Sequence, residues 1–326
     1  MRVSPHRLAA ALLTAGVLLP AATARAEALV GLTTTNQIVR FDSLAPGMAS
    51  APVAVTGIAQ NEQILGIDFR PSTGILYGLG SANNLYMLNA DTGAATFVAM
   101  LVADPGDTTD PFAGLAGASF GVDFNPVPDL GMSLPSLRVT SDAGINLRIN
   151  VNGANAGRVF TDSPLTGPAG TQIVGSAYIN NDVDPATGTS LYNIDAASDA
   201  LYLQNPPNAG TLTQVGELGV DTIGVVGFDV SAGGSAYASL TDGLTGKSGL
   251  YTIDLQTGAA TALGVFGIGG NAAIAPPLLD IAAPVPEPGT YALMALGLAG
   301  IAVAARRRRI GFRVRPASRT GTGPGM

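Results

Sequence analysis

A ten-residue segment that recurs along this chain limits the folds available to it. In the copy at 84–93, apolar and polar residues alternate until the segment ends in Asp-Thr-Gly, and the copy at 249–258 ends in Gln-Thr-Gly. Looser copies lie at 36–47, 146–157 and 200–210. Repetition of one short segment at a fixed period is typical of proteins built from stacked or radially arranged units. The architecture can therefore be predicted before any function.

The glycines that end the repeated segments set the period. Successive glycines are 46, 64, 53 and 48 residues apart, close to the roughly 40–50 residues of a four-stranded propeller blade. One full repeat is predicted to hold strands at 64–69, 75–79, 85–89 and 95–99. We expect loops, chiefly 103–118 and 126–136, to absorb the variation in length. The glycines are Gly47, Gly93, Gly157, Gly210 and Gly258.

The two ends of the repeat region complement each other. The first repeat lacks its first strand, and a spare strand is predicted within 272–281. We therefore predict an all-β fold over 27–283, a β-propeller of five four-stranded blades in which the C-terminal strand closes the N-terminal blade. Closure would leave no exposed sheet edge. An open β-sandwich or a β-solenoid is the structural alternative.

Charge is sparse and unevenly placed. Only 12% of residues are charged, against about 25% in a typical soluble domain. Between positions 27 and 284 there are 22 acidic and 6 basic residues, which gives this body a formal charge of −16. Nucleic-acid binding requires a positive surface that neutralises phosphates. An acidic body argues against a nucleic-acid partner.

The N-terminus has the three parts of a secretory signal peptide, predicted over 1–26. Arg2 and Arg7 supply positive charge, 8–19 is apolar, and 24–26 has the small-x-small pattern of a cleavage site. An uncleaved membrane anchor is the alternative, although the apolar span is short for a bilayer that needs about 20 residues.

The C-terminus has a Pro-rich linker at 284–289, an apolar run at 290–305 and a basic tail at 306–326. As a helix, the apolar run would be about 24 Å long, just short of a typical hydrocarbon core. We predict a transmembrane helix there, with the basic tail in the cytoplasm and the body outside, by the positive-inside rule. The residues of this pattern are Pro286, Glu287, Pro288, Arg306, Arg307, Arg308 and Arg309.

This order of linker, apolar helix and arginine cluster resembles the PEP-CTERM sorting signal. The resemblance implies that a membrane transpeptidase, exosortase, recognises the tail and cleaves it near Pro286–Pro288. It also implies export across the inner membrane of a Gram-negative bacterium, an anchored stage before sorting, and a final place at the cell surface or in the extracellular matrix. A plain C-terminal membrane anchor is the alternative.

A second resemblance lies in the middle of the chain. The segments 120–129, 137–142 and 146–150 resemble the signature blade of a secreted bacterial family catalogued as domain of unknown function 4394. Here an insertion at 130–136 separates Asp129 from the Leu-Arg pair that usually follows it directly. The resemblance implies the repeat fold over about 28–275 and carries no activity.

The absence of two residue types excludes several chemistries. The chain has no Cys, and its one His, His6, lies in the predicted signal peptide. The mature body would therefore lack a Ser-His-Asp or Cys-His site and the usual ligands of zinc and most transition metals. Paired-carboxylate chemistry and oxygen-ligated Ca²⁺ remain. No other cofactor is predicted.

Five residues are candidates for a ligand or metal site. Asp68, Asp123 and Asp229 occupy equivalent places on the predicted first strands, which would surround the central channel. Arg138 and Arg148 lie on adjacent predicted strands of one blade. For the aspartates the alternative is a turn cap or a pair with a neighbouring arginine, and for the arginines it is an Arg–Asp network that joins strands.

Two functions from different classes fit these observations. The first is a non-enzymatic binding or structural propeller of the cell envelope, with exopolysaccharide or another envelope component as partner. The second is a polysaccharide hydrolase or lyase that uses carboxylates on a propeller scaffold. Whether the chain is an enzyme stays open from the sequence.

Overall fold

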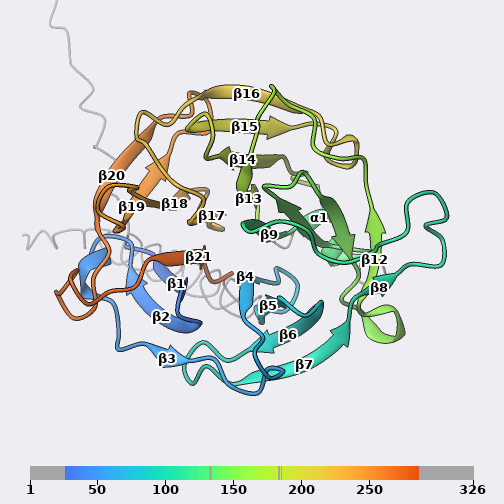
Figure 1. The fold of residues 1–326 in the computed structure, drawn as a ribbon, viewed down its shortest axis with the longest axis horizontal. Helices are drawn as coiled ribbons and strands as arrows, with labels where there is room; N and C mark the ends of the chain where they lie inside the picture. Colours follow the sequence, from blue (N-terminus) through green and yellow to red (C-terminus); the bar gives the residue numbers. More distant parts are fainter. Residues whose placement is uncertain (1–25, 132–133, 183, 185, 286–326) are drawn as a thin grey trace, which may run out of the picture.

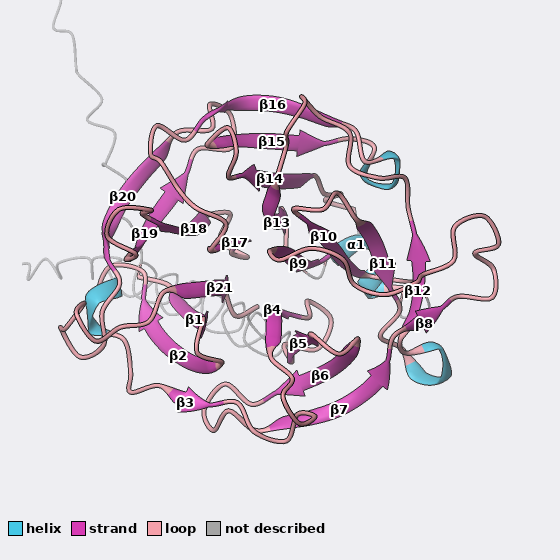
Figure 2. Cartoon of the chain, in the orientation of Figure 1, coloured by secondary structure: helices cyan, strands magenta, loops and turns pink. Residues whose placement is uncertain are grey.

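The computed structural model describes residues 26–131, 134–182, 184 and 186–285. Five sheets, antiparallel except for one edge strand, surround a common axis in these residues (Figure 1). Strands dominate, and helix is confined to a few short segments between them (Figure 2). The prediction of a five-bladed, all-β propeller is confirmed.

Blades 1 and 2 each have four strands. From the axis outward, blade 1 consists of β21 (Leu278–Ala282), β1 (Ala28–Thr33), β2 (Gln37–Asp42) and β3 (Val53–Ala54). Blade 2 consists of β4 (Ile64–Phe69), β5 (Leu76–Gly80), β6 (Asn84–Leu88) and β7 (Ala95–Met100). The 3-10 helix η1 (Pro46–Met48) follows β2.

Blade 3 has a fifth strand, and blades 4 and 5 have four each. Blade 3 consists of β9 (Phe120–Phe124), β10 (Leu137–Ser141), β11 (Asn146–Ile149), β12 (Arg158–Thr161) and β8 (Val102–Ala103). Blade 4 consists of β13 (Ile173–Tyr178), β14 (Leu191–Asp195), β15 (Ala200–Gln204) and β16 (Leu212–Glu217). Blade 5 consists of β17 (Val226–Val230), β18 (Ala236–Thr241), β19 (Ser248–Ile253) and β20 (Ala260–Val265). The 3-10 helices η2 (Gly153–Asn155) and η3 (Pro207–Ala209) are connections.

The ring closes as the sequence predicted. β21, next to the C-terminal end of the described residues, pairs antiparallel with β1, with Val30 opposite Ala282 and Leu32 opposite Asp280. The innermost strand of blade 1 therefore comes from the opposite end of the chain, beside β4 and β17 in Figure 1.

The extra length of the third repeat forms regular structure as well as loop. β8 adds a short parallel strand to the outer edge of β12. Within the predicted loop 126–136, α1 (Pro126–Leu130) forms instead, because Asn125 caps it: its side chain accepts a hydrogen bond from the N–H of Val127, and Pro126 suits the first helical turn. The expectation that loops alone absorb the variation is incomplete here.

Apolar side chains fill most of the space between adjacent blades. One buried cluster joins blades 2 and 3, where the rings of Tyr77 and Phe124 meet edge to face with centroids 5.3 Å apart. Further clusters join blades 1 and 2, blades 4 and 5, and blades 5 and 1. The junction between blades 3 and 4 instead holds polar groups, among them the buried Arg138.

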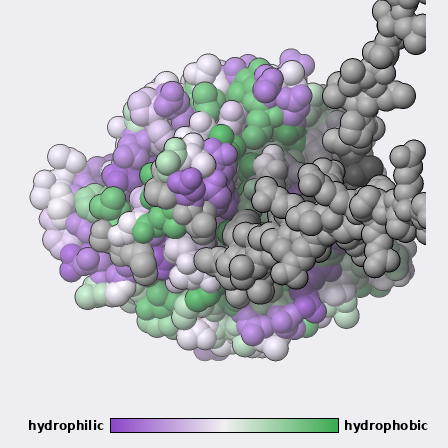
Figure 3. Space-filling view, turned by 180° about the vertical axis from the view of Figure 1, so that it is seen from behind, coloured by the Kyte–Doolittle hydropathy of each residue, from purple (hydrophilic) through white to green (hydrophobic). Residues whose placement is uncertain are grey.

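The terminal predictions fall almost wholly outside the described residues. These are the signal peptide over 1–26, most of the Pro-rich sorting linker over 284–289, the transmembrane helix over 290–305 and the basic tail over 306–326. Within 26–285, less its three short gaps, no helix is long and apolar enough to cross a bilayer. On the part of the rear face that described residues form, hydrophilic and hydrophobic residues are interspersed (Figure 3).

Candidate functional site

Three predicted site residues meet at the centre of the ring. Asp68 on β4, Asp123 on β9 and Asp229 on β17 each offer a carboxylate oxygen, and these oxygens all lie within 4.8 Å of one another. Their residues are 2%, 1% and 2% exposed. The sequence indicated all three, and the closure of the ring brings them together.

A Gly-x-Asp pattern on each of these strands explains the local geometry. A Cβ atom at Gly121 would lie within 3 Å of Ser176 on the next innermost strand, so glycine lets the two backbones approach. Gly227 approaches the backbone of Asp280 in the same way. The side chain of the aspartate two residues later can then accept a hydrogen bond from the main chain of that neighbouring blade.

We call the carboxylates of Asp68, Asp123 and Asp229 the triad. Each of them joins two blades through a main-chain hydrogen bond. Asp68 of blade 2 accepts from blade 3, Asp123 of blade 3 accepts from blade 4, and Asp229 of blade 5 accepts from the residue that follows β21. The donors are the N–H groups of Phe124, Tyr178 and Ala283, at 2.7, 3.0 and 2.6 Å. These contacts hold the innermost strands in register.

A fourth buried acid, Asp280 on β21, was missed by the sequence reasoning. It is 4% exposed and accepts hydrogen bonds from the N–H groups of Ile67, at 2.8 Å, and Ile281, at 2.9 Å. The closing strand lacks the Gly-x-Asp pattern, so no repeat pointed to this residue. An acid inside an otherwise apolar strand was the available signal.

Burial and mutual repulsion raise the pKa values of these carboxyls. Burial first, and then the charge of Asp229, raise the pKa of Asp68 well above its usual value. Burial and then Asp68 do the same to the pKa of Asp123. Burial raises the pKa of Asp229 to about 6, against the opposing effect of its main-chain donors. The raised pKa values mean that a bound proton or a bound cation, either of which reduces the negative charge, would stabilise the centre of the ring.

One oxygen of the triad has no hydrogen-bond partner. Asp123 Oδ1 accepts from Tyr178, whereas Asp123 Oδ2 is buried without a partner among the described groups. Buried polar atoms are hydrogen-bonded in the great majority of cases. This oxygen points to a ligand or a proton at the centre.

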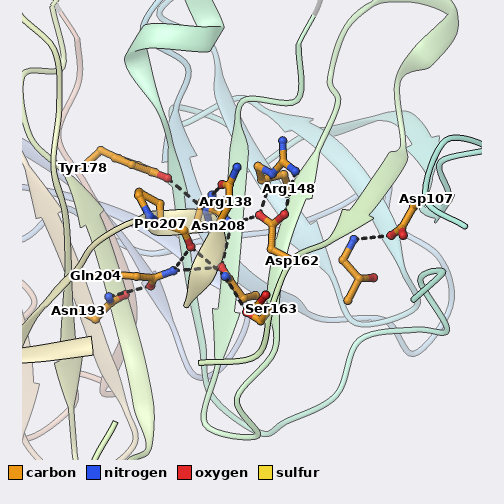
Figure 4. A network of polar contacts seen from close by, with 12 residues as sticks. Asp107, Arg138, Arg148, Asp162, Ser163, Tyr178, Asn193, Gln204, Pro207 and Asn208 are labelled. Carbon is orange, nitrogen blue, oxygen red and sulfur yellow. Dashed lines mark hydrogen bonds and ion pairs between the residues drawn. The ribbon is translucent and has the colours of Figure 1, made fainter. Parts of the chain in front are cut away.

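The two predicted arginines lie side by side in blade 3. Arg138 on β10 is directly opposite Arg148 on β11, and the Nη1 of Arg138 and the Nε of Arg148 are both 2.7 Å from Asp162. Figure 4 shows Asp162 between the two guanidinium groups. An Arg–Asp network of the kind the sequence left open forms here, and its acidic partner is Asp162, which follows β12.

The two arginines differ in what remains open to a ligand. The Arg138 side chain is 2% exposed and also donates to Asn146, to Asn208 and to the Tyr178 hydroxyl, so it bridges blades 3 and 4. The Arg148 side chain is 29% exposed and lies over the Phe160 ring, 5.4 Å from its centroid. Arg138 is an internal bridge, and Arg148 reaches the surface.

A pocket of about 200 Å³ lies beside this pair. Apolar groups, neutral polar groups and two guanidinium groups share its wall, and none of the described residues that line it is a carboxylate. The lining residues are Asn125, Pro128, Leu134, Pro135, Ser136, Arg138, Arg148, Tyr178 and Asn208. Such a wall can hold a small polar ligand by hydrogen bonds and apolar contact.

Asp129, in the middle segment that resembles a known signature, has a structural partner. Its Oδ1 is 2.7 Å from Arg70 Nε of blade 2, and its Oδ2 accepts from the N–H of Ser72. Arg70 also donates to Asn152. Arg70, the arginine that lies two residues after Asp68 in the chain, therefore pairs with Asp129 and joins blades 2 and 3.

The fold and its tail define a class of sorted propeller. Residues 37–275 match the model of a family described as Domain of unknown function (DUF4394), and residues 284–309 match the PEP-CTERM protein-sorting motif. The chain belongs to the DUF4394 family. Both resemblances proposed from the sequence are confirmed. No curated protein matches the chain significantly.

Solved structures resemble the chain only distantly. A chain of the nidogen/laminin complex is 13% identical, with 81% of this chain and 100% of that chain covered and a TM-score of 0.43. Hydrazine synthase of Kuenenia stuttgartiensis is 11% identical, with coverage of 65% and 52% and a TM-score of 0.38. A protein of unknown function from Bacteroides thetaiotaomicron is 14% identical, with coverage of 74% and 58% and a TM-score of 0.39. Resemblances this weak carry no argument about function.

Proposed function

We propose that this protein is a non-enzymatic binding module of the cell envelope, which holds a polar group of a glycan in the pocket beside Arg148. The observation that carries the proposal is the composition of that pocket. Guanidinium, amide and hydroxyl donors stand beside apolar walls, and the described lining contains no carboxylate. Sugar hydroxyls and uronate groups are hydrogen-bonded by such donors, and the apolar face of a sugar ring packs on proline or leucine.

The channel carboxylates do not suit glycoside hydrolysis. That reaction requires two carboxyl groups on either side of the scissile bond, at separations of about 5 Å or more. Asp68, Asp123 and Asp229 are buried at the centre of the ring and are engaged by main-chain donors. They do not line the pocket beside Arg148.

The sorting motif supplies the setting for this function. The PEP-CTERM motif implies processing by exosortase and export to the cell envelope or surface of a Gram-negative bacterium. We further propose that 290–305 anchors the chain in the inner membrane until cleavage near Pro286–Pro288. Deletion of 286–326 should release the body into the medium or the periplasm without an anchored intermediate, as fractionation would show. Retention of the truncated body in the cytoplasm would contradict the export proposal.

Binding can be tested with defined oligosaccharides. Calorimetric titration of the purified protein with a hexauronate and with a neutral hexasaccharide should show binding without release of reducing ends. Arg148→Gln should weaken that binding at least about tenfold, because a charge-assisted hydrogen bond contributes about 1.5–3 kcal/mol. Arg158→Gln is the matched control, since Arg158 is in the same blade but outside the pocket lining. Equal loss in both variants would indicate unspecific attraction and contradict the proposal.

One observation favours the enzymatic alternative. A surface depression in blade 4 is lined by Asp199, Glu217 and Asp221, and burial, followed by the charge of Asp221, raises the pKa of Asp199. A carboxyl whose pKa is raised by burial, close to other carboxyls, is the kind of group that can act as a general acid. Release of reducing or unsaturated ends by the wild type, abolished in Asp199→Asn and Glu217→Gln, would establish a hydrolase or lyase instead.

A further inference from the structure

We propose that Asp68, Asp123 and Asp229 together bind one hard divalent cation, Ca²⁺, at the centre of the ring. The three side chains come from blades 2, 3 and 5, so the ion would join distant parts of the chain at the axis. This role is independent of the glycan pocket.

The spacing of the oxygens fits a single ion. Ca²⁺ binds oxygen ligands at about 2.3–2.6 Å, so two oxygens on opposite sides of it are about 4.6–5.2 Å apart. The three carboxylate oxygens all lie within 4.8 Å of one another. One ion can therefore contact all three without rearrangement of the strands.

The unpartnered oxygen of Asp123 is a separate indication of a ligand. The side chain is 1% exposed, and its Oδ2 has no partner among the described groups, although its Oδ1 is held by the N–H of Tyr178. The Asp123 side chain also lies within hydrogen-bond reach of the Asp229 carboxyl, so either a shared proton or a metal ion would satisfy the buried oxygen, and the test below separates the two. The main-chain donors to Asp68 and Asp229 orient the other two carboxylates and stabilise their ionised form.

No positive side chain among the described residues neutralises the triad. The basic side chains in ion pairs there are Arg40 with Asp91, Arg70 with Asp129, and Arg138 and Arg148 with Asp162. Three buried carboxylates that repel one another are costly unless a charge compensates them. A divalent cation would reduce the formal charge of the triad from −3 to −1, and it would also offset the repulsion from the fourth buried acid, Asp280.

The chemistry of the donors selects the ion. All three donors are carboxylate oxygens, and the body has neither Cys nor His after position 6. Oxygen-only sites suit Ca²⁺ or Mg²⁺ and not zinc or copper. Three fixed carboxylates favour Ca²⁺, whose geometry is flexible, over Mg²⁺, which requires a near-ideal octahedron.

The test measures binding and stability on the whole exported protein. After dialysis against EDTA, titration with CaCl₂ should give one bound ion per chain, and about 5 mM Ca²⁺ should raise the Tm by about 5 °C or more. MgCl₂ should bind more weakly. Metal analysis of protein purified without chelator at neutral pH should find about one calcium, a readout that needs no variant.

Two variants separate this site from other acidic groups. Asp123→Asn keeps an oxygen for the Tyr178 N–H but removes a charge, so Ca²⁺ affinity should fall at least about tenfold. Asp280→Asn changes a buried acid that is outside the triad but whose charge acts on it, so this variant should keep the stoichiometry of one Ca²⁺ per chain.

Three outcomes would overturn the proposal. One is an unchanged Tm with no stoichiometric binding in the wild type, which would mean that the carboxyls hold protons. Another is undiminished Ca²⁺ binding by Asp123→Asn, which would place the ion elsewhere. The third is tighter binding of Mg²⁺ than of Ca²⁺, which would refute the assignment of the ion.

Discussion

Single buried charges hold neighbouring blades together in this protein. Arg70 joins blade 2 to Asp129 of blade 3, and Arg138 joins blade 3 to Asn208 of blade 4. Each guanidinium has several oxygen partners, which compensates for its removal from water. These residues position strands, whereas the partly exposed Arg148 remains open to a ligand.

Glu62 is a buried charged residue that joins segments within blade 2 by hydrogen bonds. Its residue is 6% exposed, and its carboxylate accepts from the Tyr86 hydroxyl at 2.6 Å and from the N–H of Ala82 at 3.0 Å. Burial acts to raise the pKa of Glu62, but hydrogen bonds from Tyr86, Asn84 and the main chain outweigh it, so the pKa lies below 4.5. The carboxylate form is therefore the stabilising one.

Replacement of Glu62 should lower stability in a pH-dependent way. Glu62→Gln should reduce the free energy of unfolding by about 1–3 kcal/mol at pH 7, because buried donors lose a charged acceptor. A lowered folded pKa means that the contribution is complete above pH 4.5 and is lost as pH falls through the folded pKa. Urea denaturation of both proteins should show the difference shrinking below pH 4.5.

The control for this prediction is Glu217→Gln, at an exposed position on β16. It should change the free energy of unfolding by no more than about 0.5 kcal/mol. A difference between wild type and Glu62→Gln that stays constant down to pH 3 would contradict the assigned role of the carboxylate.

At the scale of the element, the repeated segment is the third strand of a blade with its turn. β6 ends before a turn in which Asn89 Oδ1 accepts from the N–H groups of Asp91 and Thr92. Gly93 follows with φ +72°, and a Cβ atom there would overlap the carbonyl oxygen of Ala54 in blade 1. Gly157, Gly210 and Gly258 meet a preceding backbone carbonyl in the same way. The repeated glycine therefore marks where each turn contacts the blade before it.

Substitution of Gly93 tests this reading of the repeat. Gly93→Ala should cost more than 2 kcal/mol of unfolding free energy, from the left-handed backbone and from displacement of the blade 1 backbone, and thermal unfolding would measure it. Gly144→Ala is the matched control, because Gly144 has φ +80° but nothing within 4 Å of the added Cβ. Equal losses at both positions would show that the close contact between blades contributes nothing.

At the scale of the whole molecule, stability depends on closure by β21. Leu278 and Ile281 are 0% and 1% exposed and pack in the cluster between blades 5 and 1. Without this strand, β1 would present an unpaired inner edge. Closure therefore couples the first blade to the last.

Weakening the closing strand should destabilise the entire ring. Ile281→Ala should lower the unfolding free energy by about 2–5 kcal/mol, the usual cost of a buried Ile-to-Ala change. Calorimetry should show one transition at lower temperature, because buried apolar clusters join four pairs of adjacent blades and Arg138 joins blades 3 and 4. Ile274→Ala, at a residue 64% exposed, should leave the Tm nearly unchanged. A separate early transition in Ile281→Ala would contradict a cooperative ring.

Much of the fold could be predicted because repetition is a local property. The period of the glycines, the short apolar segments and the missing first strand sufficed for five blades closed by the last strand. β8 and α1 were missed, since a two-residue strand and a five-residue helix capped by Asn125 leave little pattern. Asp68, Asp123 and Asp229 were found because equivalent positions of a propeller converge on its axis. Asp280 was missed because the closing strand departs from that pattern.

The sequence by itself determined the blade architecture, the two family resemblances and the chemical limits of a body without Cys or predicted mature His, because these depend on residue types and their order. Only the tertiary structure decided which charged side chains pair. Asp162 pairs with Arg138 and Arg148, and Asp129 pairs with Arg70. Asp123 Oδ2 has no hydrogen-bond partner among the described groups. The reason is physical. Side chains that are far apart in the chain meet only when the ring closes. Only in the closed ring is it determined whether a carboxylate lies beside an arginine or beside another carboxylate.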